Sequence, residues 1–427
     1  MEVIEVEGGY PIAGEVTVEG AKNSALKLMA ATIMAPGVTT LTNVPNISDV
    51  HVMGKVLKYL GARIEVRGEH ELVIDTSDVD RWETPYHLVA QMRASTAVLG
   101  PLLARFGRAI VAMPGGCNIG ARKIDMHILG LEALGVSFDI DHGDINATTP
   151  NGLVGSTVTL DFASVGATEN LMMASVHARG VTTIDNAARE PEIVDLANLL
   201  NAMGARVRGA GSPVIEIEGV GELHPVNHRV VGDRIEAGTF IAMAGLCGEP
   251  VIVRGFEPVH LGLVLKKYES MGISIARGEH CCTVSRSRPL RSVDIQTLPF
   301  PGFPTDMQAQ TMCLLAQGDD SCVITENVFE NRFMFASELQ RMGADIRIEG
   351  HHAIVHGGRR FSGAEVRSPD LRGGAALVMA GLVADGITTV SDIHHIDRGY
   401  ESFVPKLQAL GAHVRRLEVE KPEGGEG

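Results

Sequence analysis

A Leu-Gly or Met-Gly step followed by alternating residues occurs six times along this chain. The six glycines, 68 to 74 residues apart, are Gly61, Gly135, Gly204, Gly272, Gly343 and Gly411. A segment with apolar residues at helical spacing precedes each glycine, and a short alternating segment such as ARIEV or ADIRI follows it. Each glycine therefore stands where a helix C-cap needs a left-handed residue. Six near-equal spacings predict an internal repeat.

A second marker, Gly-Val/Ile-Thr-Thr, follows three apolar segments that read as buried helices, at Gly37, Gly180 and Gly386. Each unit of about 70 residues is then predicted to hold two helices and about four short strands. Units this small bury their helices poorly when they stand alone. Three units around an axis, with apolar helices inward and sheets outward, would bury them, so six units predict two α/β domains of this kind.

Length and charge narrow the class of protein. A chain of 427 residues is long enough for two to three domains at roughly 150 residues each. The formal net charge of −15 disfavours nucleic acid and anionic membranes as partners. The chain has six cysteines without a CxxC pair, and its acidic start contains no secretory segment. Its apolar stretches are too short to span a membrane. These features favour a cytoplasmic location.

The common cofactor and metal motifs are missing from the sequence. It contains no GxxxxGK[ST], no GxGxxG after a strand and no HExxH. The segments EHCC and HHAIVH, beginning at Glu279 and His351, carry metal-ligating side chains but lie on alternating strand patterns, where neighbours point to opposite faces. We expect no metal site at either segment.

Clustered basic residues are the remaining sign of chemistry. Lys22 and Asn23 stand at a predicted helix start, where free N–H groups favour an anion, although the pattern by itself is more typical of an exposed lysine on a capped helix. Arg93 lies in MRAS. Cys117 follows two glycines in PGGCNIGARKIDMH, close to Arg122. Basic neighbours lower a thiol pKa and would make Cys117 an acid or nucleophile, whereas a small buried cysteine is the alternative.

Acidic and basic residues occur together in the second half of the chain. The segments GDRIEAG, ENRFM, PDLRGG and IDRGYE each combine them, and structural ion pairs between modules remain an open interpretation. Asp306 is different, because it lies between Pro304 and the helix-like QAQTMCLL. We expect Asp306 to be a catalytic carboxylate at a helix start.

Ten motifs, in order, resemble those of the UDP-N-acetylglucosamine 1-carboxyvinyltransferases, from about residue 1 to residue 418. They are GAKNSALKLMAA, MRAS, PGGCNIGARKIDMH, SVGATEN, AAREPEIVDLANLL, DRIEAGTF, FPTDMQAQ, ENRFM, DLRGGAALV and HIDRGYE. The resemblance implies two inside-out α/β domains, joined by a double crossover, with the active site in the cleft. One domain would span residues 22–231 and carry the Cys117 loop. The other would combine residues 1–21 with 232–427. The family uses no metal or organic cofactor.

The family transfers the enolpyruvyl group of phosphoenolpyruvate to the 3′-hydroxyl of UDP-N-acetylglucosamine and releases phosphate, in the first committed step of peptidoglycan synthesis. The resemblance implies Cys117 as the acid and Asp306 as the base. Phosphoenolpyruvate would be bound by Lys22, Asn23, Arg122 and Arg398. The nucleotide sugar would be bound by Asn23, Arg93, Arg122, Lys123, Ile124, Asp125, Met126, Ser164, Val165, Gly166, Asp306 and Val328. Phe162 departs from the pattern, because some members carry a basic residue there near the UDP phosphates.

Two alternatives remain open. The enzyme 5-enolpyruvylshikimate-3-phosphate synthase shares the fold and the chemistry, but the PGGC segment and the absence of a Ser/Arg-rich shikimate-binding pattern disfavour it. A nucleotide-sugar-binding regulator on the same scaffold would need no catalytic groups. The presence of Cys117 and Asp306 disfavours this second alternative.

Overall fold

The computed structural model describes residues 1–89, 95–113 and 124–419, which divide into two compact units. Unit 1 combines residues 1–18 with the chain from Asp233 onward, and unit 2 contains the described residues between 19 and 232. Each unit has its own hydrophobic core. Arg93, Cys117, Arg122 and Lys123 lie outside the described residues.

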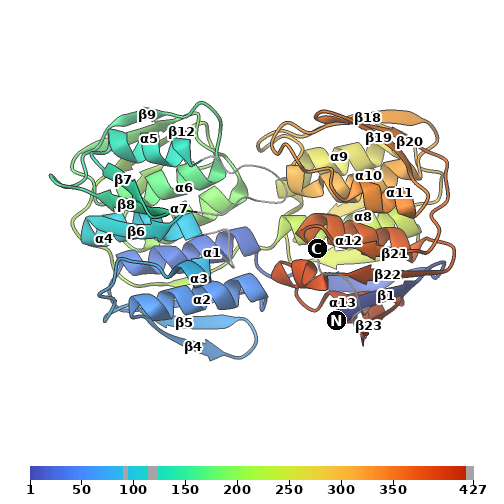
Figure 1. Ribbon diagram of the computed structural model, residues 1–427, viewed down its shortest axis with the longest axis horizontal. Coiled ribbons are helices and arrows are strands. Elements are labelled where there is room, and N and C mark those ends of the chain that lie inside the picture. Colours follow the sequence, from blue (N-terminus) through green and yellow to red (C-terminus); the bar gives the residue numbers. More distant parts are fainter. Residues whose placement is uncertain (90–94, 114–123, 420–427) are drawn as a thin grey trace. The chain divides into compact units, whose positions relative to one another are not determined.

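Buried helices fill the middle of each unit. In unit 1 these inner helices are α8 (Arg234–Cys247), α10 (Gln308–Ala316) and α12 (Leu371–Leu382), which pack against one another (Figure 1). In unit 2 they are α1 (Lys22–Ala31), α4 (Leu99–Phe106) and α6 (Val165–Ser175), and α4 packs on α6. Every residue of α10 is buried. Burial on nearly all sides explains why the segments of α6 and α12 read as apolar runs without a polar face.

The second helix of each repeat ends one or two residues before a repeat glycine. These outer helices are α2 (Ser48–Leu60), α5 (Asp125–Ala133), α7 (Pro191–Ala202), α9 (Gly262–Ser270), α11 (Ala336–Arg341) and α13 (Phe403–Ala409). All six glycines have φ between 91° and 113°, in the left-handed region that favours glycine. The predicted C-cap repeat is confirmed.

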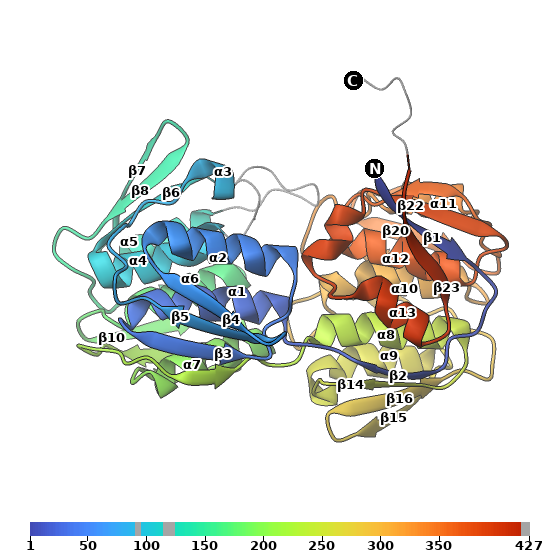
Figure 2. The same ribbon diagram turned by 90° about the horizontal axis from the view of Figure 1, so that it is seen from below.

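Three sheets surround the inner helices of unit 1 (Figure 2). The first contains β2 (Gly14–Thr17), β14 (Val251–Arg254), β16 (Cys281–Ser285) and β15 (Ser274–Gly278). The second contains β17 (Ile295–Gln296), β18 (Ser321–Thr325), β20 (His352–His356) and β19 (Asp345–Glu349). The third contains β21 (Glu365–Arg367), β22 (Ile387–Ser391), β1 (Glu2–Glu7) and β23 (His413–Glu418), so both ends of the described chain share a sheet.

Unit 2 repeats this plan with one difference. Two of its sheets have four strands: β13 (Asn227–Arg229), β3 (Val38–Thr42), β5 (Glu71–Asp75) and β4 (Arg63–Arg67); and β9 (Thr157–Thr159), β10 (Val181–Asp185), β12 (Val214–Glu218) and β11 (Arg206–Arg208). The remaining sheet has three strands, β6 (Arg108–Ala112), β8 (Asp144–Thr148) and β7 (Ser137–Asp141). Glu83 makes only an isolated parallel bridge to Ile110 where a fourth strand would lie. Pro85, which has no N–H to donate, and the short helix α3 (Tyr86–Val89) follow it directly.

The Gly-Val/Ile-Thr-Thr marker opens β3, β10 and β22, as the sequence predicts. The inner helices and outer sheets confirm the inside-out α/β class, with four strands in five of the six sheets found in the described residues. None of the helices described is both long enough and apolar enough to cross a membrane.

Candidate active site

Five of the six inner helices begin at the charged or polar motifs that the sequence singles out. These motifs lie at the starts of α1, α6, α8 and α12, and at the short helix η4 (Thr305–Met307) that leads into α10. A helix start exposes free N–H groups and the positive end of the helix dipole, which stabilise negative charge. The fold therefore places the candidate residues of each unit where anions are favoured.

Two of the acidic residues are helix caps. Asp233 Oδ1 accepts hydrogen bonds from the backbone N–H groups of Ile235 and Glu236, at 2.8 and 3.0 Å. Asp370 Oδ1 accepts them from Arg372 and Gly373, at 2.9 and 3.1 Å. These carboxylates satisfy donors that the first helical turn leaves without intrahelical partners.

Asp306 is held by two buried guanidinium groups. Arg332 Nη2 donates to Asp306 Oδ1 at 2.7 Å, and Arg372 Nη2 donates to Asp306 Oδ2 at 3.3 Å. Both arginine side chains are 4% exposed, whereas the aspartate side chain is 24% exposed. One cation on each oxygen fixes the direction of the carboxylate and favours its ionised form. Asp306 is thus an oriented hydrogen-bond acceptor with a partly open side.

The guanidinium group of Arg372 has hydrogen-bond donors that Asp306 does not use. Its Nε and Nη1 have no hydrogen-bond partner among the residues that the structure describes. Its guanidinium carbon lies 5.3 Å from the centre of the Tyr400 ring. Burial opposes the charge, but Tyr400, Asp306 and Asp233 outweigh burial and raise the pKa of Arg372. The group remains a cation, and buried donors without partners are expected to bind an oxyanion favourably.

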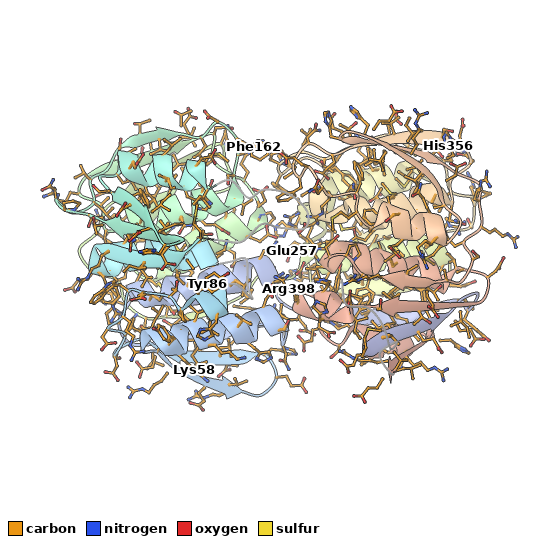
Figure 3. The ribbon with its side chains drawn as sticks, in the orientation of Figure 1. Lys58, Tyr86, Phe162, Glu257, His356 and Arg398 are labelled. Atoms are coloured by element: carbon orange, nitrogen blue, oxygen red, sulfur yellow. The ribbon has the colours of Figure 1, made fainter. Side chains whose placement is uncertain are left out.

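Val328 and Arg398 are the other predicted residues of unit 1. Val328 follows β18, and its backbone N–H donates to Glu326 Oε1 at 2.8 Å. Arg398 ends the short helix η5 (Ile393–Arg398) and is half-buried (Figure 3). The adjacent Asp397 accepts from both Nη atoms of Arg416, at 3.1 and 2.7 Å. This anchor holds the backbone next to Arg398.

Lys22 begins α1 in unit 2. Its Nζ lies 2.8 Å from Asp49 Oδ2 in the first turn of α2. The lysine side chain is 12% exposed and the aspartate side chain 4%. Asn23 is exposed. The ion pair therefore orients Lys22, while Asn23 keeps a side chain open to solvent.

The predicted nucleotide-binding turn Ser164–Gly166 caps α6. Ser164 Oγ accepts from the Ala167 N–H at 3.4 Å. A Cβ added at Gly166 would lie 3.1 Å from Cε1 of His127, so the His127 ring packs against this turn. Phe162, just before the turn, is 38% exposed (Figure 3).

His127 comes from α5, whose first residues are the predicted Asp125 and Met126, with Ile124 directly before them. Its Nδ1 is 3.0 Å from Asn170 Nδ2. Burial, reinforced by the nearby Lys27, lowers the pKa of His127 from 6.5 to about 4, and Asp125 opposes this only in part. The imidazole is neutral near pH 7, and its Nδ1 accepts the hydrogen bond from the Asn170 amide.

Sequence reasoning missed two groups in these sites. Asp49 and Glu326 are 3% exposed carboxylates that hold predicted site segments, yet neither lies in a motif with a catalytic pattern. In the sequence, Arg332 and Arg372 stand out only as members of mixed-charge segments. These four residues share one feature in the sequence: each is a charged residue that the repeat pattern places near a helix start or a strand end. This feature alone does not identify a site residue, because many charged residues have it and only the contacts in the fold distinguish them.

The histidine- and cysteine-containing segments lie on strands, as predicted. Cys281 begins β16 and His352 begins β20, while Glu279 and His280 precede β16. Among the described residues, no group of three or more His, Cys, Asp or Glu side chains is arranged to hold a metal ion.

Comparison with known proteins gives a consistent family. Residues 6–407 match the family model of EPSP synthase (3-phosphoshikimate 1-carboxyvinyltransferase). The chain is 52% identical to UDP-N-acetylglucosamine 1-carboxyvinyltransferase 2 of Carboxydothermus hydrogenoformans, over 98% of this chain and 100% of that protein. It is 49% identical to UDP-N-acetylglucosamine 1-carboxyvinyltransferase of Geotalea uraniireducens, with the same coverage.

Solved structures agree on the architecture. The enolpyruvyl transferase NikO from Streptomyces tendae superposes with a TM-score of 0.89 at 27% identity, covering 98% of this chain and 99% of NikO. EPSP synthase from Acinetobacter baumannii superposes with a TM-score of 0.76 at 19% identity, covering 98% of this chain and 100% of that one, a likeness of fold alone. The chain therefore belongs to the EPSP synthase family, and within it to the UDP-N-acetylglucosamine 1-carboxyvinyltransferases.

Proposed function

We propose that the protein transfers the enolpyruvyl group of phosphoenolpyruvate to the 3′-hydroxyl of UDP-N-acetylglucosamine and releases phosphate. The observation that carries this proposal is the carboxylate of Asp306, held by Arg332 and Arg372 with an open side. Such a group can accept the proton of a hydroxyl that attacks an electrophile. The relatives that match nearly the whole chain carry the name of this activity. The product would enter peptidoglycan synthesis.

The proposed reaction is an addition followed by an elimination. Cys117 donates its thiol proton to C3 of phosphoenolpyruvate, which leaves C2 electron-poor. The 3′-hydroxyl oxygen bonds to C2 while Asp306 accepts the hydroxyl proton, and a tetrahedral ketal forms. The Cys117 thiolate then takes a proton from C3, the C2–O bond to phosphate breaks as phosphate takes up the proton held by Asp306, and the double bond between C2 and C3 is restored. Each positioned acid or base contributes roughly 10²–10⁴-fold to such a rate.

Cations are needed because phosphoenolpyruvate carries a phosphate and a carboxylate. We assign Lys22, Arg122 and Arg398 to these groups, with Asn23 beside the reacting hydroxyl. The spare donors of Arg372 support a further contact with one of the anionic groups. Orientation by Asp49 supports the role of Lys22, because a fixed lysine loses less side-chain entropy when the anion binds.

We assign the nucleotide sugar to the helix starts at Asp125 and Ser164 and to the Asp306 and Val328 segments. Ser164, Val165 and Gly166 form the first turn of α6, where N–H groups favour the diphosphate. The run from Arg122 to Met126, together with Arg93, would complete this subsite. Phe162 supplies an apolar surface beside the turn where some family members carry a cation.

Four further proposals concern the domains, the substrate class, the cofactor and the location. The domains are those expected from the sequence, residues 22–231 and residues 1–21 with 232–427. The reaction proceeds with small-molecule substrates and without a resident cofactor, and it takes place in the cytoplasm.

Phosphate release tests the proposal. Purified protein is incubated with phosphoenolpyruvate and either UDP-N-acetylglucosamine or shikimate 3-phosphate. We expect phosphate only with the nucleotide sugar, and loss of most turnover in Cys117→Ala. Release with shikimate 3-phosphate would instead assign the chain to the other enolpyruvyl transfer. Tight binding of the nucleotide sugar without any phosphate release would indicate a binding protein.

A further inference from the structure

Glu326 is a buried carboxylate beside the proposed sugar site of unit 1. It directly follows β18 and is 3% exposed. Its Oε1 accepts hydrogen bonds from Thr297 Oγ1 at 2.8 Å, Val328 N at 2.8 Å and Phe329 N at 3.2 Å. Its Oε2 accepts one from Thr305 Oγ1 at 2.9 Å. All four of these donors are neutral.

This single side chain connects two segments that the proposed function uses. Thr305 immediately precedes Asp306, so the bond to Oε2 holds the turn that carries the proposed base. The bonds to Oε1 hold the backbone of Val328 and Phe329. Thr297 reinforces the second segment, because its Oγ1 accepts from the Asn327 N–H at 2.9 Å. A shift of Glu326 would therefore move both segments together.

The hydrogen bonds to Glu326 also decide whether the backbone of the Val328 loop offers donors or acceptors to a ligand. The N–H groups of Val328 and Phe329 are both used by Glu326. Within the described part of the chain, no backbone N–H group donates to the Val328 carbonyl. The backbone group that Val328 can offer to a ligand is then an acceptor. Asp306, ionised between two guanidinium groups, is likewise an acceptor.

We propose that Glu326 is a positioning residue that joins the Asp306 turn and the Val328 loop, so that both present hydrogen-bond acceptors to a ligand with hydroxyl or amide N–H donors. An amino sugar with a free hydroxyl and an acetamido N–H has this character. The inference rests on the proposed function. It adds that specificity for the sugar comes from a residue that does not touch it.

Two substitutions at Glu326 separate hydrogen-bond geometry from charge. Glu326→Gln keeps an acceptor oxygen for the two backbone N–H groups, and the Thr305 hydroxyl can rotate to accept from the new amide. Glu326→Asp keeps the charge but is shorter by one methylene and cannot serve both segments. We expect wild-type kinetics within about twofold for the glutamine variant. For the aspartate variant, we expect KM for UDP-N-acetylglucosamine to rise about tenfold, because the loss of one hydrogen bond changes a binding constant by about this ratio. We expect KM for phosphoenolpyruvate to change less than about twofold.

Thr305→Val tests the connection to Asp306 alone. We expect kcat to fall by about tenfold, because the turn that carries Asp306 is no longer held to Glu326 and the base can shift from its position. Thr388→Val is the matched control in the same unit, since Thr388 is fully buried and its hydroxyl has no hydrogen-bond partner in the residues described. It should keep wild-type kcat and both KM values.

Several results would overturn the inference. Wild-type kinetics in both Glu326→Asp and Thr305→Val would show that the connection has no role. A parallel rise of both KM values with a lower melting temperature would indicate a structural role only. Equal damage in the glutamine and aspartate variants would contradict the acceptor pattern.

Amide hydrogen exchange without substrates keeps this test independent of the reaction. Val328 and Phe329 should exchange slowly in the wild type and in Glu326→Gln, and at least about tenfold faster in Glu326→Asp. If the wild type released no phosphate, the proposed function would fail while the exchange rates still decided the role of Glu326. Equal exchange in all three proteins would refute the positioning role.

Discussion

The buried histidine at the nucleotide-binding turn should make folding sensitive to mild acid. His127 is 8% exposed, and its ring has the Asn170 amide on one side and the Gly166 turn on another. Its pKa of about 4 lies below the ordinary value of 6.5. The native state keeps this ring neutral at pH values where the unfolded chain already binds a proton. The contribution to stability is therefore complete above pH 6.5 and is lost as the pH falls toward about 4.

The size of the effect follows from the pKa difference. One pKa unit corresponds to about 1.4 kcal/mol. Linkage between about pH 8 and about pH 5 then gives a loss of about 2 kcal/mol in the free energy of unfolding from His127 alone. The full difference, reached below both pKa values, is about 3 kcal/mol.

The substitution His127→Gln isolates the contribution of His127 to the pH dependence of stability. Urea unfolding of the wild type and of the variant is followed at about pH 8 and about pH 5, and the pH dependence of each protein is compared. We expect the drop between the two pH values to be smaller by about 2 kcal/mol in the variant, because glutamine does not titrate. His177→Gln replaces a half-buried histidine of the same unit, whose Nδ1 lies 2.9 Å from the Val220 carbonyl oxygen, and serves as the matched control.

The comparison has a clear negative result. An equal drop in the wild type and in His127→Gln would show that the ring is not held neutral by burial. A larger drop in the variant would reverse the sign and refute the assignment of the Asn170 hydrogen bond to the neutral ring.

Three further predictions concern catalysis and binding. Asp306→Asn should lower kcat by at least about 100-fold, because an amide cannot accept the hydroxyl proton; a loss confined to KM for the nucleotide sugar would make Asp306 a binding residue only. Cys117→Ala should abolish most turnover and remove the fastest site of thiol alkylation, and full activity in this variant would refute the acid role. Cys117→Asp should keep some activity and resist fosfomycin, the thiol-alkylating epoxide that inhibits the family. Gly166→Ala should weaken binding of UDP-N-acetylglucosamine about tenfold, since the added methyl group would lie 3.1 Å from the His127 ring; calorimetry that shows unchanged affinity would contradict this packing.

Alkylation should be selective because burial raises the pKa of most other thiols. The pKa rises to about 12 for Cys247, to about 11 for Cys282 and to about 12 for Cys322, and it is also raised for Cys313. These thiols remain protonated near neutral pH and react slowly. Mass spectrometry after brief alkylation checks this directly.

Local signals in the sequence were sufficient for the architecture. The repeat glycines could be recognised because a helix C-cap needs a left-handed residue, and the requirement recurs in every unit. The apolar runs of α6 and α12 could be recognised as buried helices because they lack a polar face. The motifs at the helix starts gave the positions of Lys22 and Asp306. All of these signals lie within about ten residues of the feature that they predict.

The tertiary structure decided which side chains meet. Asp306 is 26 residues from Arg332 and 66 residues from Arg372 along the chain, and equivalent positions in the repeat do not show that these side chains meet. Glu326 reads as an ordinary charged residue after a strand until Thr297 and Thr305 are brought to its two oxygens. Ion pairs and hydrogen bonds between distant residues depend on how strands and helices pack, and composition and spacing do not record that packing. The sequence by itself therefore determined the repeats and the family, while the contacts that orient the proposed base appeared only in the folded chain.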